Sequence, residues 1–401
     1  MAQAIGAVAA LHADRVRTRR WEAADTDLQT VIDQLLRVGY ELRQDDARVE
    51  DHPHPRNCVL NLVVTVREGK RTEAVDRLVA ELSAPHPMRA ILLHLNSGHG
   101  DGTLDAAITA DAHRLLSGFP VQREQVLLRV RGPVADHLAS LVEALLVPDI
   151  PTFLWWSGRS ELDRPALDQV SEVADVLVVD SAELDRPVEA LLDLAALTRA
   201  SPPTPTLRGG PIGVKDLRWS RLRPWRDAVG QFFAPASRQH LLAGVDKFSC
   251  ESAGSKPGSR VGAALLAGWV AAALGWRFVD VGAAREEPAT NAVADTGHGH
   301  RVQVTLRSVP NDHLAEGELL DVQLAGETED GPFAVSMERD RGGGNHAQLT
   351  IVLGADTLRQ RLPLPRMGDP DLLLHVLMIS QRDPVFESAL AGASVLLASL
   401  R

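Results

Sequence analysis

The sequence predicts a two-domain protein: an α/β N-terminal domain with a mainly parallel sheet, followed by an α+β C-terminal domain with an antiparallel sheet. The chain has 401 residues, more than one ordinary domain contains. Before residue 200, apolar segments alternate with amphipathic ones, as in folds where helices connect parallel strands. After residue 300, several strand-like segments follow one another, which favours an antiparallel sheet. We expect a linker over residues 201–214, because the run SPPTPTLRGGP is rich in proline and glycine.

The first part of the chain is expected to hold a helical segment over residues 1–50 and the α/β domain over residues 51–200. In the helical segment, Asp25 or Thr26 can cap a helix, because apolar residues recur at helical spacing from Leu28 to Leu36. The α/β domain begins with CVLNLVVTV, an almost continuous apolar run that fits a strand buried on both faces. We expect strands over 58–66, 90–95, 103–109, 125–130, 152–156 and 176–179, and helices over 72–82, 134–146, 165–173 and 187–200.

The C-terminal domain, expected over residues 215–401, shows a different pattern. Its apolar stretch VGAALLAGWVAAAL is too short to span a bilayer and is expected to form a buried helix. The residues RGGGN separate two strand-like segments, which is a hairpin signal. We expect helices over 215–233 (interrupted at Pro224), 262–274, 370–380 and 384–400, and strands over 245–250, 302–309, 318–325, 333–339 and 347–353.

Charge and cysteine content exclude several classes of function. The net charge is −11, so the chain repels phosphate backbones, which argues against nucleic acid as the main partner. Two cysteines, Cys58 and Cys250, provide neither a disulfide framework nor a cysteine-rich zinc site. The N-terminus has small apolar residues before its basic ones, which is the wrong order for a secretory signal. We therefore expect a cytoplasmic protein with no membrane contact.

Common motifs of enzymatic chemistry are missing from the sequence. No GxGxxG follows the first strand, no Walker loop occurs, and no GxSxG marks a nucleophilic serine. This pattern argues against an oxidoreductase, and we expect no cofactor and no catalytic residue. The run AGSKPGSR (residues 253–260) precedes a predicted helix and could attract an anion. The alternative is a flexible loop in which Ser259 caps the helix.

Several histidines could be metal ligands. His298 and His300 lie near Asp295, and His52 and His54 form a second pair. Each pair lies in a loop with glycine or proline, where histidines are usually solvated, and a complete ligand set is not evident. We therefore expect no metal site.

Two further side chains leave alternatives open. Asp101 in GHGDG could act as an acid or base, although Gly-Asp-Gly is more often a plain turn. Cys58 lies near Arg56 and could be redox-active, or it could be a small buried core residue. A regulatory disulfide between Cys58 and Cys250 would require the domains to bring them together.

The tryptophans indicate either binding or packing. Trp155 and Trp156 are adjacent on a predicted strand, so they face opposite ways, and one must be covered by a helix, another domain or a partner. A second pair lies six residues apart in an arginine-rich segment, residues 218–226. Tryptophan and arginine are both enriched in binding hot spots, whereas buried tryptophan also fills cores. The candidate partner-binding residues are Trp155, Trp156, Trp219, Arg221, Trp225 and Arg226, with domain–domain packing as the alternative.

Several segments resemble those of the OpcA family. The stretch LVEALLVPDIPTFLWWSG (residues 141–158) is similar to a signature block with an apolar helix, Pro-Asp-x-Pro and a strand ending in Trp-Trp-x-Gly. The segment DLRWSRLRPWRDAVGQFF is similar to a second block, and CVLNLVVTV with HPMRAILLHL resembles the first strand pair. LLAGWVAAALGW and DPVFESAL resemble later blocks, so the resemblance runs from about residue 55 to the C-terminus. Matching positions include Asn61, Pro87, Arg89, Pro148, Asp149, Pro151, Gly158, Asp216, Leu217, Leu222, Pro224 and Phe232.

This resemblance implies a cytoplasmic, non-catalytic protein that binds glucose-6-phosphate dehydrogenase and assembles or allosterically activates its oligomer in the oxidative pentose phosphate pathway. Some members are linked to thioredoxin-dependent redox control through several cysteines, and this chain departs from that pattern because it has only two. The alternative is an enzyme or a sugar-phosphate- or nucleotide-binding α/β protein, since the sheet ends and the arginine-rich segment could hold a phosphate.

Overall fold

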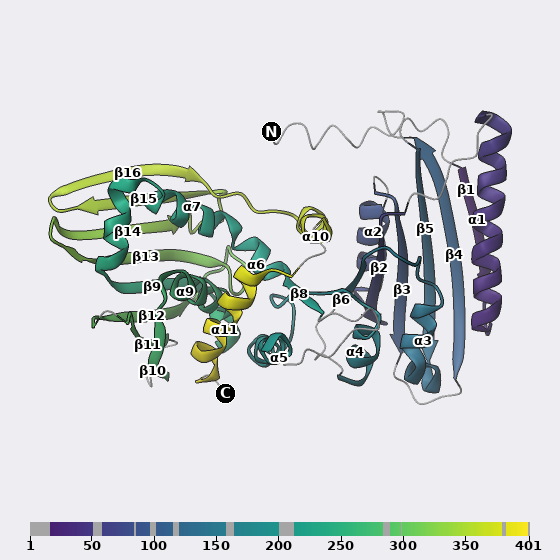
Figure 1. Cartoon of the computed structure of the whole chain (residues 1–401), viewed down its shortest axis with the longest axis horizontal. Helices are drawn as coiled ribbons and strands as arrows, with labels where there is room; N and C mark the ends of the chain where they lie inside the picture. The colour runs from purple at the N-terminus through teal and green to yellow at the C-terminus, as the bar shows by residue number, and fades with distance from the viewer. Residues whose placement is uncertain are drawn as a thin grey trace. The chain divides into compact units, whose positions relative to one another are not determined.

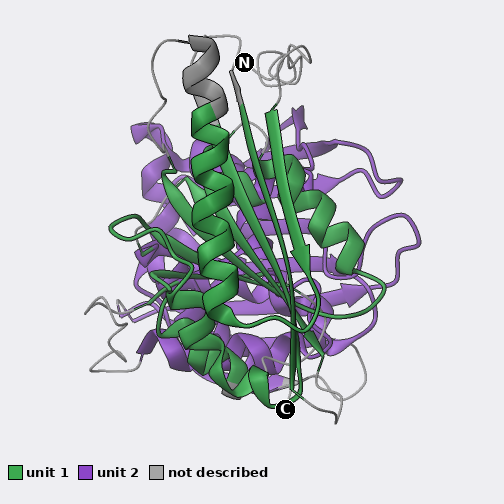
Figure 2. Cartoon of the chain, turned by 90° about the vertical axis from the view of Figure 1, so that its right-hand side faces the viewer, with its two compact units in different colours: residues 1–179, 202–213, 373–382 green, residues 180–201, 214–372, 383–401 purple. Residues whose placement is uncertain are grey.

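The structure is a computed structural model that describes residues 17–50, 58–83, 86–96, 102–114, 120–157, 164–199, 212–283, 289–297, 299–378 and 382–399. The chain forms two compact units, which Figure 2 shows in different colours. Unit 1 comprises residues 1–179, 202–213 and 373–382, and unit 2 comprises residues 180–201, 214–372 and 383–401. Unit 1 holds a mainly parallel sheet and unit 2 a mainly antiparallel one, as predicted. Residues 201–211 of the expected linker lie outside the described residues.

The sheet of unit 1 has the strand order β1-β4-β5-β3-β2-β6-β7-β8 (Figure 1), and the unit boundary falls inside β8, after Gly213. The strands from β5 to β7 are parallel, whereas β4 and β1 add an antiparallel edge. Counted in chain order without β1 and β4, the strands follow 3-2-1-4-5-6, the doubly wound order of dinucleotide-binding folds. The strands are β1 (Arg17–Ala23), β2 (Leu60–Arg67), β3 (Met88–Asn96), β4 (Thr103–Arg114), β5 (Pro120–Arg131), β6 (Thr152–Ser157), β7 (Val176–Val179) and β8 (Gly213–Asp216).

Helices cover this sheet where the apolar periodicity predicts them. Strand β2 is buried along its length up to Arg67, which confirms that its apolar run is covered on both faces. Helix α2 packs on β2 and β3 through its apolar residues. The helices of unit 1 are α1 (Leu28–Glu50), α2 (Thr72–Ser83), the 3₁₀ helix η2 (Gly132–His137), α3 (Leu138–Glu143) and α4 (Arg164–Ser171).

The N-terminal segment is part of this unit, not a separate helical segment. Strand β1 pairs with β4, and α1 packs on both strands. The cap of α1 is Asp27, not Asp25 or Thr26: its carboxylate accepts the Thr30 backbone N–H at 2.9 Å and the Thr30 hydroxyl at 2.8 Å. These two bonds hold the pKa of Asp27 below its usual range, and the bond from the Thr30 backbone N–H has the larger effect. Asp25 instead has a positive φ of 48° in the turn before the cap.

Buried polar side chains hold the turn that precedes β6. Asn61 is fully buried, donates to the Val147 carbonyl at 2.9 Å and accepts the Val147 N–H at 3.0 Å. Arg89 donates to the Leu145 carbonyl at 2.6 Å and to the Glu124 carboxylate at 2.8 Å. Asn61 and Arg89 match positions of the family pattern, and both satisfy backbone or charged groups that would otherwise be buried unpaired.

The sheet of unit 2 has the order β10-β11-β12-β9-β13-β14-β15-β16. Only the β9–β12 pair is parallel among the pairings of its described residues, and β14 and β15 form the predicted hairpin. Strand β12 alternates between buried and exposed residues, as expected for a sheet with one covered face. The strands are β9 (Val245–Ala253), β10 (Arg277–Ala283), β11 (Ala289–Asp295), β12 (Arg301–Val309), β13 (Leu319–Thr328), β14 (Gly331–Arg339), β15 (His346–Leu353) and β16 (Asp356–Pro363).

The sequence analysis did not predict β1, β8, β10, β11 or β16, and residues 215–216 of β8 lie where it expected a helix. Strand β16 has the sequence DTLRQRLP and is exposed on both faces apart from one half-buried residue, so no apolar alternation marks it. It is held by backbone pairing with β15, a long-range contact that its own sequence does not reveal.

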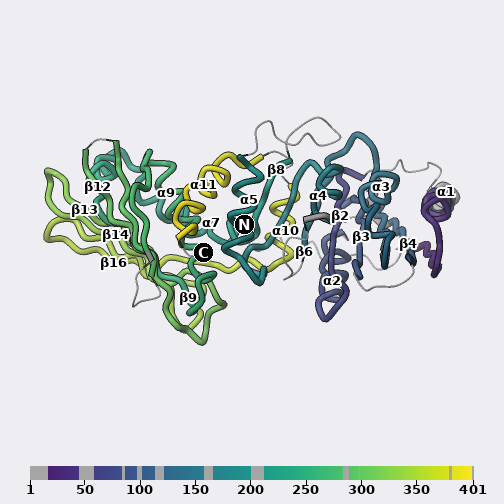
Figure 3. The backbone as a smooth tube through the Cα atoms, turned by 90° about the horizontal axis from the view of Figure 1, so that it is seen from below, coloured from purple at the N-terminus to yellow at the C-terminus, as the bar shows by residue number. Residues whose placement is uncertain are grey.

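Helices α9 and α11 form the core of unit 2 and lie side by side (Figures 1 and 3). The predicted burial of α9 is confirmed, because 67% of the stretch Pro257–Leu274 is buried inside the structure. The expectation that the stretch is too short to span a bilayer is wrong, because with η4 included it is long and apolar enough to cross a membrane. A Cβ atom on Gly268 would lie 2.2 Å from the Ala389 carbonyl oxygen, so the close approach of the two helices requires glycine there. The remaining helices are α5 (Pro187–Arg199), α6 (Leu217–Arg221), α7 (Arg223–Phe233), α8 (Ala236–Gln239), η3 (His240–Gly244), η4 (Pro257–Arg260), α9 (Val261–Leu274), α10 (Asp369–Leu377) and α11 (Pro384–Ala398).

Helix α5 belongs to unit 2, although the predicted α/β domain extended to residue 200. Helix α5 packs against α9 and α11, and its buried residues include Leu191 and Leu194. The compact-unit boundary therefore falls after β7, at Val179, and again inside β8. The order of elements along the chain favours placing α5 in the α/β domain, because α5 follows β7 directly.

Candidate functional site

The two tryptophans of β6 are both buried. Trp155 and Trp156 are each 5% exposed, and β6 lies between β2 and β7. Trp156 lines a small pocket together with Leu138 of α3 and Ala166 of α4. Burial of both rings favours the packing alternative for this pair. A direct contact with a partner stays a prediction.

The second tryptophan pair is also buried, within unit 2. Trp219 is 4% exposed, and its Nε1–H donates to the Asp383 carboxylate at 3.2 Å. The Arg226 guanidinium lies 3.6 Å from the centroid of the Trp219 ring, a cation–π contact. Burial lowers the pKa of Arg226 to about 10, against the attraction of Asp383. Trp225 is 2% exposed, and Arg339 of β14 lies 5.7 Å from its ring centroid.

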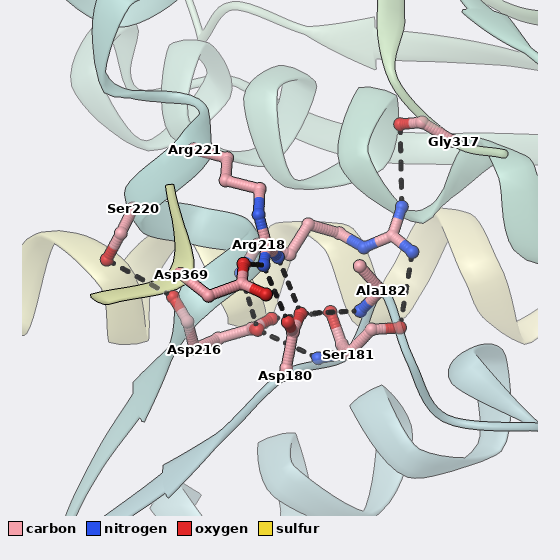
Figure 4. A network of polar contacts seen from close by, with 9 residues as sticks. All are labelled: Asp180, Ser181, Ala182, Asp216, Arg218, Ser220, Arg221, Gly317 and Asp369. Carbon is pink, nitrogen blue, oxygen red and sulfur yellow. Dashed lines mark hydrogen bonds and ion pairs between the residues drawn. The ribbon is translucent and has the colours of Figure 1, made fainter. Parts of the chain in front are cut away.

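Next to these rings, a network of polar side chains fixes α6 (Figure 4). Asp216 caps the helix: its carboxylate accepts the Arg218 N–H at 2.9 Å, the Ser181 N–H at 3.0 Å and the Ser181 hydroxyl at 2.6 Å. The buried guanidinium of Arg218 donates to the Ser181 carbonyl at 3.2 Å. The chain segment after β7 is thereby joined to the start of α6.

Arg221 connects two carboxylates of the same network. It binds both oxygens of Asp180 at 2.7 and 2.8 Å, and it donates to Asp369 at 3.0 Å. Burial alone would lower the pKa of Arg221, but the bonds to Asp180 and Asp369 outweigh it and raise that pKa. The Arg221 side chain is 29% exposed and Arg226 is half-buried, whereas the rings of Trp219 and Trp225 are buried.

Burial dominates the electrostatics of the network. It raises the pKa of the Asp216 carboxyl, and the neighbouring charge of Asp180 adds to that effect. It lowers the pKa of Arg218, whose Nε has no hydrogen-bond partner among the described residues. Every oxygen of Asp216 is engaged by groups of the same unit, so the arrangement stabilises the α6–α7 segment.

The predicted anion loop before α9 binds an anion from its own unit. The Glu316 carboxylate accepts the backbone N–H groups of Ser255 at 3.3 Å and Lys256 at 3.2 Å, and it accepts the Ser259 hydroxyl. The hydroxyl bond is the main cause that lowers the pKa of Glu316. Ser259 therefore does not cap the helix, and the attraction of this loop for negative charge is satisfied internally.

The predicted metal and acid–base candidates find little support in the described part of the chain. His52, His54, Asp101 and His298 lie outside it. His300 contacts the Val245 carbonyl at 3.2 Å, and Asp295 accepts the Gly297 N–H at 2.9 Å. No group of three or more His, Cys, Asp or Glu side chains with metal-site geometry occurs among the described residues.

The two cysteines lie in different environments. Cys250 is fully buried in β9, where burial raises the pKa of its thiol. Cys58 is half-buried just before β2. A thiol with a raised pKa is a poor nucleophile, which favours a packing role for Cys250.

The carboxyl edge of the parallel sheet in unit 1 carries a small pocket. Its lining comes from the ends of β2, β3 and β6 and from η2, α3 and α4. The pocket has a volume of about 70 Å³, well below the roughly 300–1,000 Å³ of sites that enclose drug-sized ligands. Sequence reasoning missed it, because its polar lining residues Thr65 and Ser157 are single polar positions in otherwise apolar strands.

Two protein-family matches include residues of both units. Residues 79–196 match a family described as the N-terminal domain of the glucose-6-phosphate dehydrogenase subunit, of the OpcA assembly type. Residues 212–390 match the family described as the C-terminal domain of the same OpcA protein. Together these matches cover most of the chain; the first ends within α5, and the second begins one residue before β8.

Curated relatives carry the same family name. A protein of Synechocystis sp., provisionally named OxPP cycle protein OpcA, is 26% identical over 202 residues, which cover 50% of this chain and 37% of that protein. Its namesake in Synechococcus elongatus is 23% identical over 279 residues, covering 68% of this chain and 59% of the relative. The matched stretch thus spans about half the length of these relatives.

Solved structures align with this chain at low identity. An oxidoreductase from Sinorhizobium meliloti aligns with a TM-score of 0.49 and 11% identity, covering 86% of this chain and 97% of that one. Glucose-6-phosphate 1-dehydrogenase from Mycobacterium avium aligns with a TM-score of 0.45 and 11% identity, covering 84% and 90%. Nothing about function follows from likenesses this distant. The family matches carry the assignment, and the chain belongs to the OpcA family.

Proposed function

We propose that this protein binds glucose-6-phosphate dehydrogenase and promotes its assembly or activates it allosterically, without catalysis of its own. The observation that carries the proposal is the family match, which extends over both compact units. The curated relatives are named for the oxidative pentose phosphate cycle, to which that dehydrogenase belongs. The proposed partner acts on soluble metabolites, so we place the protein in the cytoplasm.

Activation would follow from differential binding. A partner protein shifts the dehydrogenase towards an active conformation or oligomer only by the difference in its affinity for the two states. The proposal therefore requires that this protein bind the active state more tightly, and a stable complex of this kind should bury more than about 1,000 Å².

For the contact surface, the outer side of the α6–α7 segment is our candidate. The rings of Trp219 and Trp225 face inward, whereas Arg221 and Arg226 are half-buried and Arg223 is exposed. Arg221 pairs with Asp180 and Asp369, and Arg223 pairs with Asp227, so this segment presents a patch of mixed charges that can match a complementary charged surface of the partner. The buried network around Asp216 would hold that patch rigid before binding.

The test combines kinetics and mass. Dehydrogenase activity is measured against glucose 6-phosphate concentration with and without this protein, and mass photometry follows the oligomer. We expect a heavier complex with a raised rate or a lowered half-saturation concentration. A complex with a higher melting temperature but unchanged kinetics would reduce the role to stabilisation. Absence of any complex with the cognate enzyme would end the proposal.

A charge reversal tests the surface. Arg223→Glu changes a side chain that is 51% exposed and pairs with Asp227 on the next turn. We expect slower association and a weaker dependence on salt, because exposed interface charges act mainly on the association rate. Arg359→Glu on the exposed strand β16 is the matched control. Equal effects of both variants would show general charge repulsion and would remove α6–α7 from the interface.

A further inference from the structure

The solvent side of α1 carries two large apolar side chains one turn apart. Leu36 is 58% exposed, and Tyr40, the one tyrosine of the chain, is 57% exposed. The other side of the helix, which includes Val31, Leu35 and Leu42, is buried, and α1 packs on β1 and β4. Figure 2 shows α1 in front of the strands of unit 1, with no described element of that unit over it. The apolar pair is therefore open to a further protein surface.

The residues around this pair form a seven-residue repeat. An exposed pair at this spacing can stabilise its own helix and nothing more, so the repeat matters. The outer seam of α1 consists of positions separated alternately by four and three residues: Gln29, Asp33, Leu36, Tyr40, Arg43 and Ala47. None of its side chains from position 29 to position 43 is buried. An average spacing of 3.5 residues is the one by which a helix presents a continuous face to another helix.

The outer seam is complementary to itself when two copies of α1 lie antiparallel. Val38 lies midway between Leu36 and Tyr40 in the sequence, and also midway between Asp33 and Arg43. With a two-fold axis at the level of Val38, Leu36 of one copy therefore meets Tyr40 of the other. The same axis brings Asp33 of each copy opposite Arg43 of the other. One symmetry operation thus pairs the apolar side chains with each other and the two opposite charges with each other.

The charges of the seam favour this antiparallel pairing. In a parallel pair in register, Asp33 would face Asp33 and Arg43 would face Arg43, and like charges across an interface repel. In the described part of α1, Arg37 forms an ion pair with Glu41 at 2.9 Å, while the Asp33 carboxylate accepts the side-chain amide of Gln29 at 2.9 Å. The Arg37 side chains of two antiparallel copies would approach each other near the axis, and Glu41 offsets their charge. Asp33 and Arg43 are left to pair across the interface.

We propose that two copies of this chain form a dimer through antiparallel pairing of the outer seam of α1. The contact is isologous, because a two-fold axis makes the same patch of both copies meet itself. Aromatic residues such as Tyr40 are enriched at protein interfaces. One helix from each copy forms the contact, so it is smaller than the roughly 1,200–2,000 Å² of a standard stable interface. The dimer is therefore weak and depends on protein concentration.

Exchange of the two charges tests the pairing. Sedimentation velocity of the full chain should show a monomer–dimer equilibrium between about 1 and 100 µM. Asp33→Arg and Arg43→Asp should each weaken the dimer by about tenfold or more, because each variant places like charges opposite each other on both sides of the axis. The double variant with both changes should restore the dimer, since the ion pairs form again with exchanged signs. The matched control is Glu81→Arg, a charge reversal at an exposed position of α2 in the same unit.

A cysteine crosslink tests the register. When the variants Leu36→Cys and Tyr40→Cys are mixed and oxidised, crosslinked dimer should form faster than in either variant alone, because these positions meet only across the two copies. Both side chains are exposed, so the variants should fold. Absence of a dimer up to about 100 µM overturns the proposal. So does a dimer that both single charge reversals leave unchanged, a double variant no tighter than the single ones, or equal crosslinking in all mixtures. The measurements use this chain alone, so they are independent of whether the dehydrogenase binds.

Discussion

Replacing Trp219 by alanine should distinguish a packing role from a partner-contact role. The ring is 4% exposed, stacks obliquely on Phe386 with centroids 5.7 Å apart and carries the Arg226 guanidinium on its face. Truncation of a buried tryptophan to alanine costs about 3–5 kcal/mol of unfolding free energy. It also removes the Nε1–H bond to Asp383, which then has one oxygen unpaired.

That cost can be expressed as a melting temperature. For a unit of this size, each 1 kcal/mol shifts the transition by about 2–4 °C, so Trp219→Ala should lower it by about 6–20 °C. Trp219→Phe retains one aromatic ring but loses the hydrogen bond and the volume of the second indole ring, so it should cost less than alanine and give a smaller shift. Scanning calorimetry of both variants measures the transition of unit 2, and mass photometry measures binding of the dehydrogenase.

The expected order of stability is wild type, Trp219→Phe, then Trp219→Ala, with partner affinity unchanged at temperatures where the variants are folded. The opposite pattern would refute this reasoning: an unshifted transition together with a loss of affinity of tenfold or more, which is about 1.4 kcal/mol. In that case the ring would be a hot spot that becomes accessible on binding.

Three further perturbations follow from the structure. Burial, with two neighbouring carboxylates, raises the pKa of Asp321 from 3.8 to about 7, so the folded state retains a proton that the unfolded chain has released, and stability falls as pH rises through this interval. The Asp321→Asn variant should therefore have a higher melting temperature than wild type, and the difference should grow from pH 4 to 7 and stay constant above pH 7. A difference in melting temperature that does not depend on pH would contradict the raised pKa of Asp321. Asn61→Ala should cost about 1–3 kcal/mol for each buried group of Val147 left unpaired, measured by urea denaturation, and an unchanged midpoint would contradict the role of Asn61. Gly268→Ala should cost about 1–3 kcal/mol or more by forcing a Cβ against a carbonyl oxygen of α11, whereas Gly230→Ala, which meets nothing within 4 Å in α7, should be neutral or stabilising.

Periodicity in the sequence was sufficient for elements whose burial pattern is local. The apolar run of β2, the amphipathic pattern of α2 and the all-apolar α9 each predict their own structure, because side-chain spacing matches the period of the element. Strand β16 shows the limit: its residues are exposed, and only pairing with β15 makes it a strand.

The candidate site was likewise predictable only where the signal was local. Sequence reasoning located the tryptophan and arginine segments, and their order along the chain carried the resemblance to the OpcA family. It did not reveal that the rings face inward, since burial depends on which distant elements cover a residue. It also did not reveal the pocket at the ends of β2 and β6, because these strands are far apart in the chain and meet only in the sheet.

By itself, then, the sequence determined the kinds of elements, the division into a parallel and an antiparallel part, and the family. These depend on residue spacing and on blocks of local sequence. The tertiary structure alone decided that α5 belongs to unit 2, that Glu316 occupies the predicted anion loop, and that a small pocket lies at the ends of β2, β3 and β6. Each of these is a contact between segments distant in the chain, and no local pattern specifies which distant group a side chain will meet.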